Sequence, residues 1–397
     1  MSKIVVIGAG ASGIIAALKA SINNEVILID GNDKCGKKLL ITGNGKCNYW
    51  NEDIDIKNYY TSDIEILNKI LEKNKIGLNY LYDLGIYPNI KNGYYYPASG
   101  LAASIREIFS KELEKSNVKT LYNNKVISVI KNNDKYIIET KSEKITCDKV
   151  IIATGSKASS KTGSDGFGYN VAKQFGHHIN PVLPSLTALK TKEIVKEWAG
   201  VRSEVKLSLY INDVLEKEEF GEIQLTEDGI SGICTFNISS IVSRKIHQNK
   251  KVKVKINFVP DIDNFYDFFN IRNQKLPNRT IEELLESLLN YKLTNVLLKK
   301  CKINKDSYWN NLSELEKKSL INNICNFELN IVETNSFDKA QVCTGGIPLN
   351  EVTQNMESIY SKNLYLIGEL LDVDGKWGGF NLAFAFITGY IVGENIR

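Results

Sequence analysis

The start of the chain has the apolar pattern of a parallel sheet that is buried on both faces. Residues 3–8 (KIVVIG) and 25–30 (EVILID) are short runs rich in Val, Ile and Leu. Runs without polar alternation are typical of strands that helices cover on both sides. Between them, the small and apolar residues at 14–20 suit a helix. We therefore expect a strand–helix–strand unit here.

Helices and short strands are expected in the next part of the chain. Apolar residues recur at helical spacing over 99–115, and Ser62-x-x-Glu65 has the form of a capping box before an apolar stripe at 66–71. Residues 149–155 (KVIIATG) predict another buried strand, which ends in a glycine turn. Three further strands are expected at 125–130, 135–140 and 144–147.

A strict alternation of apolar and polar residues begins beyond Pro184. It covers 205–211, where the odd-numbered residues are apolar, and 251–258, where lysines alternate with apolar residues. The solvated face of a small barrel explains these lysines better than a basic patch does.

The helical period returns after residue 260. Thr280-x-x-Glu283 and Ser313-x-x-Glu316 are capping boxes in front of apolar stripes. The expected fold class is α/β, with one domain made from both chain ends and two segments inserted into it. The expected boundaries are 1–188 and 335–397 for this domain, 189–260 for a β-barrel-like insert completed by 326–345, and 261–325 for a helical insert.

The composition excludes several specialised classes. The chain has 397 residues, of which 43% are hydrophobic and 24% charged, as in ordinary multi-domain globular proteins. A net charge of +4 is too small for this length to indicate nucleic-acid binding. The longest late apolar stretch, 382–393, is too short to cross a membrane.

Cysteine and histidine give no sign of a metal site. The seven cysteines are scattered and contain no Cys-x-x-Cys, which indicates reduced thiols and a cytoplasmic location. Packing is the favoured role of Cys47 and Cys343. The pair His177–His178 is expected to mark a surface turn.

A G-x-G-x-x-G sequence, from Gly8 to Gly13, joins the first predicted strand to the first helix. Gly8 allows the tight turn, Gly10 lets the backbone approach a pyrophosphate, and Gly13 allows close helix–strand packing. The helix N-terminus offers free N–H groups to phosphates. Asp30 ends the second strand 22 residues after Gly8, where a carboxylate accepts hydrogen bonds from an adenosine ribose. Together these features predict dinucleotide binding.

The C-terminal part of the chain favours FAD over NAD. The pair Gly378–Gly379 opens a second helix, and Glu369, Asp372 and Asp374 before it are carboxylates suited to ribityl hydroxyls or to orienting loops. A ligand that both chain ends reach must be long. Residues 36–51 form an irregular Lys- and Gly-rich segment that suits a loop over a flavin.

Several segments together carry a family resemblance that spans essentially the whole chain: GKKLLITGNGKCN, GYYYPASGLAA, KVIIATGS, and AQVCTGGIPLNEV followed by LYLIGELLDVDGKWGGFNLAFAF. The chain resembles the BaiN-type flavoproteins, also called aminoacetone-oxidase-family FAD-binding enzymes. The resemblance implies a Rossmann-like, glutathione-reductase-type FAD domain with a small β-barrel and a helical subdomain inserted. Asp30, Asn44 and Trp377 depart from that family, in which Glu, Gly and a smaller residue are usual.

The resemblance also implies which residues contact the cofactor. The glycine turn would face the pyrophosphate, Asp30 the ribose, Val126 the adenine, and the loop around Cys47 the flavin. The expected FAD-binding residues are Gly8, Gly10, Ala11, Ser12, Gly13, Asp30, Lys38, Leu39, Gly43, Gly45, Lys46, Cys47, Asn48, Val126, Ala153, Thr154, Gly155, Gly368, Glu369, Asp374, Gly379, Phe380, Asn381 and Leu382.

The expected activity is that of an FAD-dependent oxidoreductase, with no catalytic residue or oligomeric state assigned. No second G-x-G-x-x-G with a following acid occurs, so NAD(P)H would bind only transiently against the flavin. We expect NAD(P)H-dependent reduction of an activated C=C bond in a small or medium organic substrate, without a nucleic-acid or membrane partner. Two alternatives stay open: an oxygen-using oxidase of amines or 2-amino ketones, and a non-catalytic or RNA-associated flavoprotein.

Overall fold

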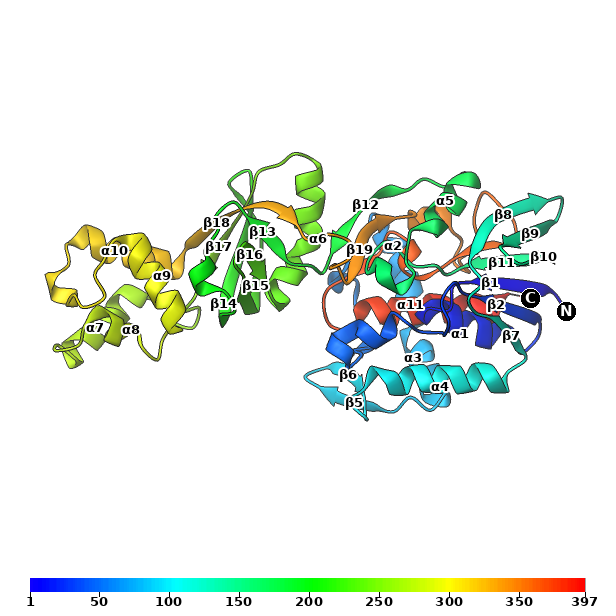
Figure 1. Ribbon diagram of the computed structural model, residues 1–397, viewed down its shortest axis with the longest axis horizontal. Helices are drawn as coiled ribbons and strands as arrows, with labels where there is room; N and C mark the ends of the chain where they lie inside the picture. Colours follow the sequence, from blue (N-terminus) through cyan, green and yellow to red (C-terminus); the bar gives the residue numbers. More distant parts are fainter. Residues whose placement is uncertain (397) are drawn as a thin grey trace. The chain divides into compact units, whose positions relative to one another are not determined.

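The computed structural model describes residues 1–396 and divides them into two compact units. The first unit is Met1–Ser185 together with the chain from Phe337 onward, and the second is Leu186–Ser336. In Figure 1 both ends of the chain, in blue and red, lie in the first unit. This unit is therefore assembled from the two ends of the sequence.

A five-stranded parallel sheet forms the centre of the first unit, in the order β20–β11–β1–β2–β7. β1 (Lys3–Ile7) pairs with β2 (Glu25–Ile29) on one side and with β11 (Lys149–Ile152) on the other. β7 (Val118–Leu121) and β20 (Leu364–Leu366) are the edge strands. The inner strands are buried along almost their whole length, as their apolar runs predict.

Two helices from opposite ends of the chain pack against each other. α1 (Ala11–Ala20) follows β1, and α11 (Phe380–Asn395) closes the described chain. A Cβ atom at Gly389 would lie 2.4 Å from the Ser12 carbonyl oxygen, and one at Gly393 would meet α1 at 2.6 Å. Figure 1 shows this contact, with α1 in blue beside α11 in red. Glycine in α11 thus lets the C-terminal helix lie directly on the N-terminal one.

Smaller sheets and helices surround the central sheet. The three strands expected after residue 125 are confirmed as the antiparallel sheet β8 (Val126–Asn132), β9 (Lys135–Thr140) and β10 (Lys144–Cys147). The other paired strands are β3 (Trp50–Asn51), β6 (Tyr94–Pro97) and β5 (Pro88–Lys91) in one sheet, β4 (Tyr59–Tyr60) with β21 (Asp374–Gly375), and β12 (Asn180–Ser185) with β19 (Val342–Gly346). The other helices of this unit are α2 (Ile64–Leu71), α3 (Asn74–Asp83), α4 (Ala102–Lys115) and α5 (Phe167–Gln174).

The capping box predicted at Ser62 is wrong. The N-cap of α2 is Asp63, one residue later, and the Ser62 hydroxyl donates to the Asp63 carboxylate at 3.1 Å. Asp is as good an N-cap residue as Ser, so the helix start moves by one position and Glu65 no longer stands where the box requires it.

The second unit contains a closed barrel in the order β13–β16–β15–β14–β17–β18. Its strands are β13 (Leu189–Thr191), β14 (Arg202–Ile211), β15 (Val214–Leu225), β16 (Gly229–Ser231), β17 (Val252–Asn257) and β18 (Phe327–Thr334), with α6 (Ile233–His247) packed on them. Val205, Leu207 and Leu209 are buried, which confirms the alternation in β14. The predicted small barrel is therefore present, and the fold class is confirmed.

Two of the barrel lysines, Lys206 and Lys253, are paired with carboxylates. Lys206 lies 2.9 Å from Glu218, and Lys253 lies 2.9 Å from Glu328 and 3.0 Å from Asp213. The exposed face of these strands is thus mixed in charge, as the solvated-face interpretation predicts.

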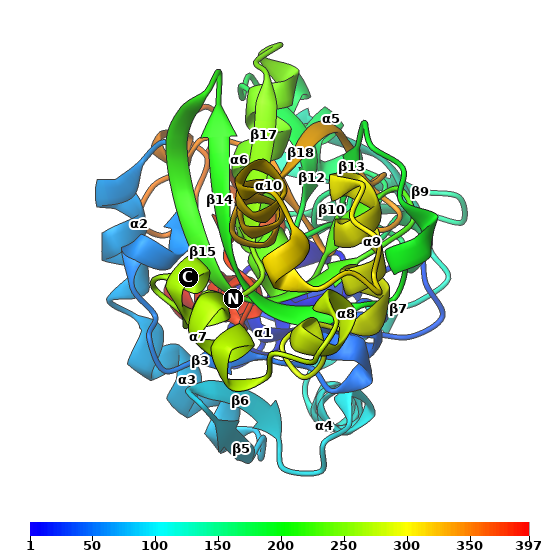
Figure 2. The same ribbon diagram turned by 90° about the vertical axis from the view of Figure 1, so that its left-hand side faces the viewer.

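A helical part completes the second unit. It consists of α7 (Phe265–Lys275), α8 (Ile281–Leu285), α9 (Tyr291–Cys301) and α10 (Glu314–Cys325), which Figure 2 shows grouped together in yellow. Both capping boxes predicted here, at Thr280 and at Ser313, are present. These helices share one continuous apolar core with the barrel.

Candidate functional site

The parallel sheet brings distant parts of the sequence to one edge. The carboxyl ends of parallel strands lie on the same side, so the turns after β1, β2, β11 and β20 are neighbours. These turns carry the residues that the sequence singled out: the glycine turn from Gly8, then Asp30, the segment 153–155, and the segment 368–369. This edge is the place where doubly wound sheets bind nucleotides.

The three fingerprint glycines differ in what surrounds them. Gly8 has φ +106°, and a Cβ atom there would lie 2.5 Å from the Ala153 carbonyl oxygen. A Cβ atom at Gly13 would lie only 1.9 Å from the Gly8 carbonyl oxygen. At Gly10, by contrast, a Cβ atom would meet nothing within 4 Å. Gly8 and Gly13 are therefore needed to build the turn, whereas Gly10 borders open space that a ligand can fill.

The N-terminus of α1 faces this open space without a cap from the chain. Its N-cap residue is Gly10, which has no side chain, and the first turn contains no acidic residue. The first N–H of the helix to bond within it is that of Ile14, which donates to the Gly10 carbonyl at 3.0 Å. The preceding N–H groups and the positive end of the helix dipole suit the phosphates of a dinucleotide.

Asp30 is held at the end of β2 by the neighbouring loops. Its carboxylate accepts hydrogen bonds from Ala9 N at 2.7 Å and from the backbone and side-chain nitrogens of Asn32 at 2.7 and 2.9 Å. Asn124 N donates to the Asp30 carbonyl at 3.0 Å, which brings the start of β8, and thus Val126, to this region. The carboxylate keeps further lone pairs for a ribose.

The loop 36–51 begins on the glycine turn, because Gly36 N donates to the Ala9 carbonyl at 2.8 Å. Leu39 is buried, and Gly43, Gly45 and Cys47 have positive φ angles that curl the loop. Lys46 is exposed and Asn48 buried. Burial raises the pKa of the Cys47 thiol to about 11, so this cysteine is a poor nucleophile at neutral pH.

Glu369 is the centre of a polar cluster that joins three parts of the chain. Its carboxylate accepts hydrogen bonds from Lys38 Nζ at 2.7 Å, Ser156 Oγ at 2.7 Å and Cys343 N at 3.0 Å. Burial, followed by the nearby Glu369 carboxylate, raises the pKa of the Cys343 thiol to about 11. The ion pair with Glu369 fixes the charged end of Lys38, whose backbone lies close to the glycine turn.

The turn after β11 packs closely on its surroundings. Ala153 N donates to the Ile7 carbonyl at 2.8 Å, Gly155 has φ +69°, and a Cβ at Gly168 would lie 2.3 Å from the Thr154 hydroxyl oxygen. A Cβ atom at Gly368 would likewise lie 2.6 Å from the Ser12 hydroxyl oxygen of α1. Both turns are therefore part of the floor of the site.

The start of α11 carries the last group of predicted cofactor residues. Gly379 is its N-cap with φ +94°, and a Cβ atom there would lie 2.4 Å from the Trp50 carbonyl oxygen. The Asn381 amide bonds reciprocally with the backbone of Gly375, at 2.9 Å in both directions. The Phe380 carbonyl accepts from Tyr59 Oη at 3.1 Å.

Two further predicted residues lie near this helix start. Asp374 is buried and accepts a hydrogen bond from Ser185 Oγ at 3.2 Å, and Leu382 is half-buried in the first turn of α11. The ring of Trp377 meets that of Tyr94 in a T-shaped contact, with centroids 5.2 Å apart.

Sequence reasoning missed several residues that organise the site. Asn32 stands two positions after Asp30, and Ser156 is the last residue of the KVIIATGS segment, so both lie at predicted motifs without being predicted as site residues. Asn180, which donates to the Asp372 carboxylate at 2.6 Å, gave no sequence signal, because its partner is 192 residues away.

The expectation that both histidines of the pair lie on a surface turn is wrong for His177. Its side chain is fully buried, whereas that of His178 is 79% exposed. The burial comes from a loop more than 170 residues further along the chain, which local pattern reading does not detect. No group of His, Cys, Asp and Glu suited to a metal ion occurs among residues 1–396.

The helices of the described chain include none that is long and apolar enough to cross a bilayer.

The site fits a dinucleotide such as FAD. The space beside Gly10 is open, the uncapped N–H groups of α1 suit the oxygens of a phosphate, and Asp30 offers a carboxylate at the ribose position. The close approach of Ala153 to Gly8 and of the Gly8 carbonyl to Gly13 fixes the shape of the turn.

Comparison with known proteins places these features in a family. Residues 2–395 match the HI0933-like protein Rossmann domain. A 3-dehydro-bile acid delta(4,6)-reductase of Clostridium scindens is 37% identical over 99% of this chain and 98% of its own length. A ribosomal RNA dihydrouridine synthase of Haemophilus influenzae is 28% identical, covering 98% of this chain and 97% of its own.

A solved structure shows the same fold at low identity. The 3-ketosteroid-delta4-(5alpha)-dehydrogenase of Rhodococcus jostii, determined with 4-androstene-3,17-dione, superimposes with a TM-score of 0.53. The match covers 99% of this chain and 96% of that one at 13% identity, so it bears on the fold alone.

Proposed function

The chain belongs to the HI0933-like Rossmann family of flavoproteins, and on that premise we propose that it reduces an activated C=C bond with NAD(P)H as electron donor. It is an FAD-dependent oxidoreductase. The proposed substrate is a small or medium-sized organic molecule in which a carbonyl group is conjugated to the double bond.

The observation that carries this proposal is the full-length similarity to a reductase of bile acids. That relative's name describes the reduction of ring double bonds in a 3-oxo compound. The name of the second relative describes the conversion of uridine to dihydrouridine. Both reactions add two hydrogens across a C=C bond conjugated to a carbonyl group, which supports this reaction class over amine oxidation.

Three groups of the chain are assigned to binding FAD in such a reaction. We assign the α1 N-terminus to the FAD diphosphate and Asp30 to the adenosine ribose. Lys38, fixed by Glu369, places a positive charge close to the glycine turn. When bound, FAD supplies the transfer of a hydride equivalent between two molecules. In the net reaction NAD(P)H gives its hydride, a proton comes from solvent, and C=C becomes CH–CH.

We assign substrate contact to the aromatic pair of Trp377 and Tyr94. Both rings are half-buried, and Trp377 lies two residues before Gly379, the N-cap of α11. Half-buried rings in this arrangement offer flat apolar surface to a ring system of similar character.

A second candidate function is the reduction of a uridine in RNA. The names of the dihydrouridine synthase relatives favour it. The pairing of Lys206 and Lys253 with Glu218, Asp213 and Glu328 weighs against it, because paired lysines attract phosphates less strongly.

Product analysis separates these reactions. The FAD-loaded protein is incubated anaerobically with NADPH and either a 3-oxo-4,6-diene bile acid or uridine-containing ribosomal RNA. The masses of the products are then measured by mass spectrometry. We expect the bile acid to gain two hydrogens and the RNA to be unchanged. A gain only in the RNA would establish the second candidate. Oxygen uptake with amines, without either product, would establish the oxidase.

A further inference from the structure

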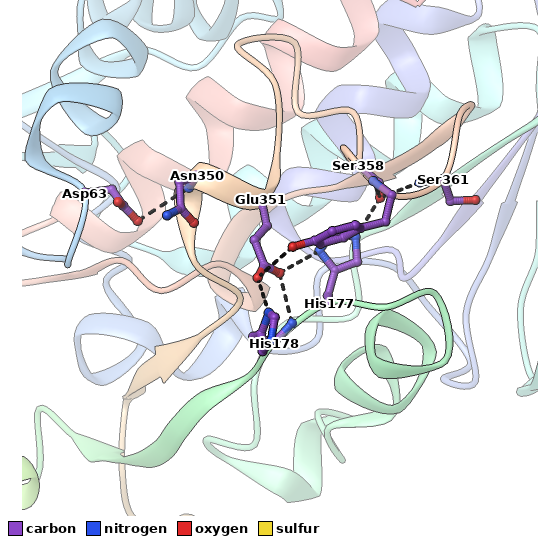
Figure 3. Close-up of polar contacts among 8 residues, drawn as sticks. Asp63, His177, His178, Asn350, Glu351, Ser358 and Ser361 are labelled. Carbon is purple, nitrogen blue, oxygen red and sulfur yellow. Dashed lines mark hydrogen bonds and ion pairs between the residues drawn. The ribbon is translucent and has the colours of Figure 1, made fainter.

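A carboxylate outside the cofactor segment is fully occupied by hydrogen-bond donors. Glu351 lies in a short helical turn, residues 349–351, that follows β19, and it is 6% exposed. One of its oxygens accepts from His177 Nδ1 at 3.1 Å and from His178 N at 2.9 Å. The other accepts from His178 Nδ1 at 2.6 Å and from Tyr360 Oη at 3.3 Å. We call this group, which Figure 3 shows together with Ser358, the Glu351 clasp.

The hydrogens of the clasp have one consistent arrangement. An ionised carboxylate only accepts, so Nδ1 of His177 carries its proton. Nε2 of the same ring then accepts from the Ser358 hydroxyl, 2.7 Å away. The Ser358 oxygen in turn accepts from the backbone N–H groups of Tyr360 and Ser361, both at 3.1 Å. Each polar group of this buried network has a partner, which gives a rigid junction.

Burial and contacts within the clasp set the directions in which the pKa values of its groups shift. Burial lowers the pKa of His177, although its hydrogen bond and charge interaction with Glu351 oppose this. Burial alone would raise the pKa of Glu351, but hydrogen bonds from His178 and His177 hold it below the usual value. Burial and the carboxylate raise the pKa of Tyr360. At neutral pH the clasp therefore contains an ionised Glu351 and a neutral His177.

The clasp closes one end of the two-stranded ribbon formed by β12 and β19. His177 and His178 lie three and two residues before the start of β12, and Glu351 follows β19 by five residues. At that end of the ribbon Asn180 pairs with Gly346. The carboxylate thus ties together the two chain segments that enter and leave the ribbon.

The same ribbon makes contact with the carboxylates of the C-terminal segment. Asn180 donates to Asp372 at 2.6 Å, and Ser185 donates to Asp374 at 3.2 Å. Backbone bonds add to this junction, since Asp372 N donates to the Ile347 carbonyl at 2.7 Å, next to the ribbon end. The position of the ribbon therefore fixes the segment that carries the predicted cofactor residues.

We infer that Glu351 is a positioning residue for FAD: the clasp holds β12–β19 in register, and through Asn180 it sets Asp372 and the neighbouring cofactor segment. This inference rests on the proposed use of residues 368–374 in FAD binding. Glu351 itself does not touch the cofactor segment; it acts through the ribbon.

The test measures FAD retention of the purified holoprotein. Serial dilution at a temperature well below unfolding, with free-flavin fluorescence as readout, gives the dissociation constant. Glu351→Gln replaces two acceptor positions by an N–H₂ group that faces donors, so we expect FAD to dissociate about tenfold more readily. Tyr360→Phe removes only the outermost of the four bonds and should fold even if Glu351→Gln does not. We expect it to weaken retention about twofold.

A double-mutant cycle distinguishes positioning from a general loss of stability. In an Asn180→Ala background the side-chain bond to Asp372 is absent, while the Ser185 bond and the backbone bond of Asp372 remain. We therefore expect Glu351→Gln and Tyr360→Phe to have a clearly smaller effect on FAD dissociation in that background than in the wild type. Equal effects in both backgrounds would overturn the inference, as would unchanged dissociation in the folded variants. Failure of the wild-type protein to hold FAD would instead contradict the proposed function.

Discussion

At the scale of single residues, the glycine turn separates a role in folding from a role in ligand binding. The Cβ atom that Gly10→Val adds would meet no atom of the chain within 4 Å, and the backbone of Gly10, with φ −84°, tolerates a side chain. We expect this variant to fold with nearly normal stability and to purify without FAD, because the side chain fills the space for the diphosphate. The measurement is flavin absorbance per protein together with a thermal melt.

Gly13→Val is the matched control for that prediction. Its Cβ atom would lie 1.9 Å from the Gly8 carbonyl oxygen, so the helix must move away from the turn. We expect the free energy of unfolding to fall by several kcal/mol, whether or not FAD is supplied. A Gly10→Val protein that carries one FAD per chain would show that the fingerprint does not bind the cofactor.

Trp377 tests the proposed substrate contact. Trp377→Ala removes one ring of the half-buried pair with Tyr94, and we expect KM for an apolar ring substrate to rise about tenfold while kcat changes little. Trp377→Phe retains aromatic surface and should lie close to the wild type. Steady-state kinetics give both constants. An equal fall in kcat and kcat/KM, with KM unchanged, would contradict a binding role.

The residue scale also shows what the sequence could not reveal. Gly8, Gly10 and Gly13 have the surroundings that their spacing predicts, because the motif, the strand and the helix are local. His177 does not, because its burial depends on Glu351 and Ser358, which are far away in sequence. Local patterns contain no signal for such a contact.

At the scale of elements, the capping residues give a direct test. The Thr280 hydroxyl accepts from Glu283 N at 3.3 Å and the Glu283 carboxylate accepts from Thr280 N at 2.8 Å. Thr280→Ala removes half of this box, and we expect the free energy of unfolding to fall by about 1 kcal/mol. Urea unfolding measures it.

Ser62→Ala is the matched control. The Ser62 hydroxyl donates to the neighbouring Asp63 carboxylate, and Ser62 does not cap α2. We expect a change in unfolding free energy within about 0.5 kcal/mol of zero. A larger loss for Ser62→Ala than for Thr280→Ala would contradict the assigned helix starts.

Element types followed from the sequence more readily than element partners. The buried runs at β1, β2 and β11 and the alternation in β14 each reflect one local environment. The pairing of β12 with β19 joins segments about 160 residues apart and includes an irregular register between Asn180 and Leu183. Neither strand has a strong alternation, so their pairing could not be predicted from pattern.

At the scale of the whole molecule, the clasp predicts how stability depends on pH. The folded protein binds a proton on His177 less readily than the unfolded chain, because burial lowers its pKa from 6.5. Below that pH the unfolded state takes up more protons, so the free energy of unfolding decreases with falling pH. Glu351 adds a second loss below about 4.5, since its lowered pKa keeps the folded carboxylate ionised to lower pH.

Urea unfolding over a series of pH values on both sides of 6.5 measures this dependence. His177→Asn removes the titrating group, so we expect a shallower decline below that value than in the wild type. Identical slopes in the two proteins would exclude His177 as the source.

The central claim is that the first unit carries FAD and passes electrons to an activated C=C bond. Its most direct test is the anaerobic absorption spectrum of the FAD-loaded protein during addition of NADPH and then of a conjugated 3-oxo steroid. We predict that NADPH bleaches the flavin bands and that the steroid restores them in a one-to-one ratio. Bands that persist with both NADPH and NADH, or that stay bleached after the steroid is added, would contradict the account.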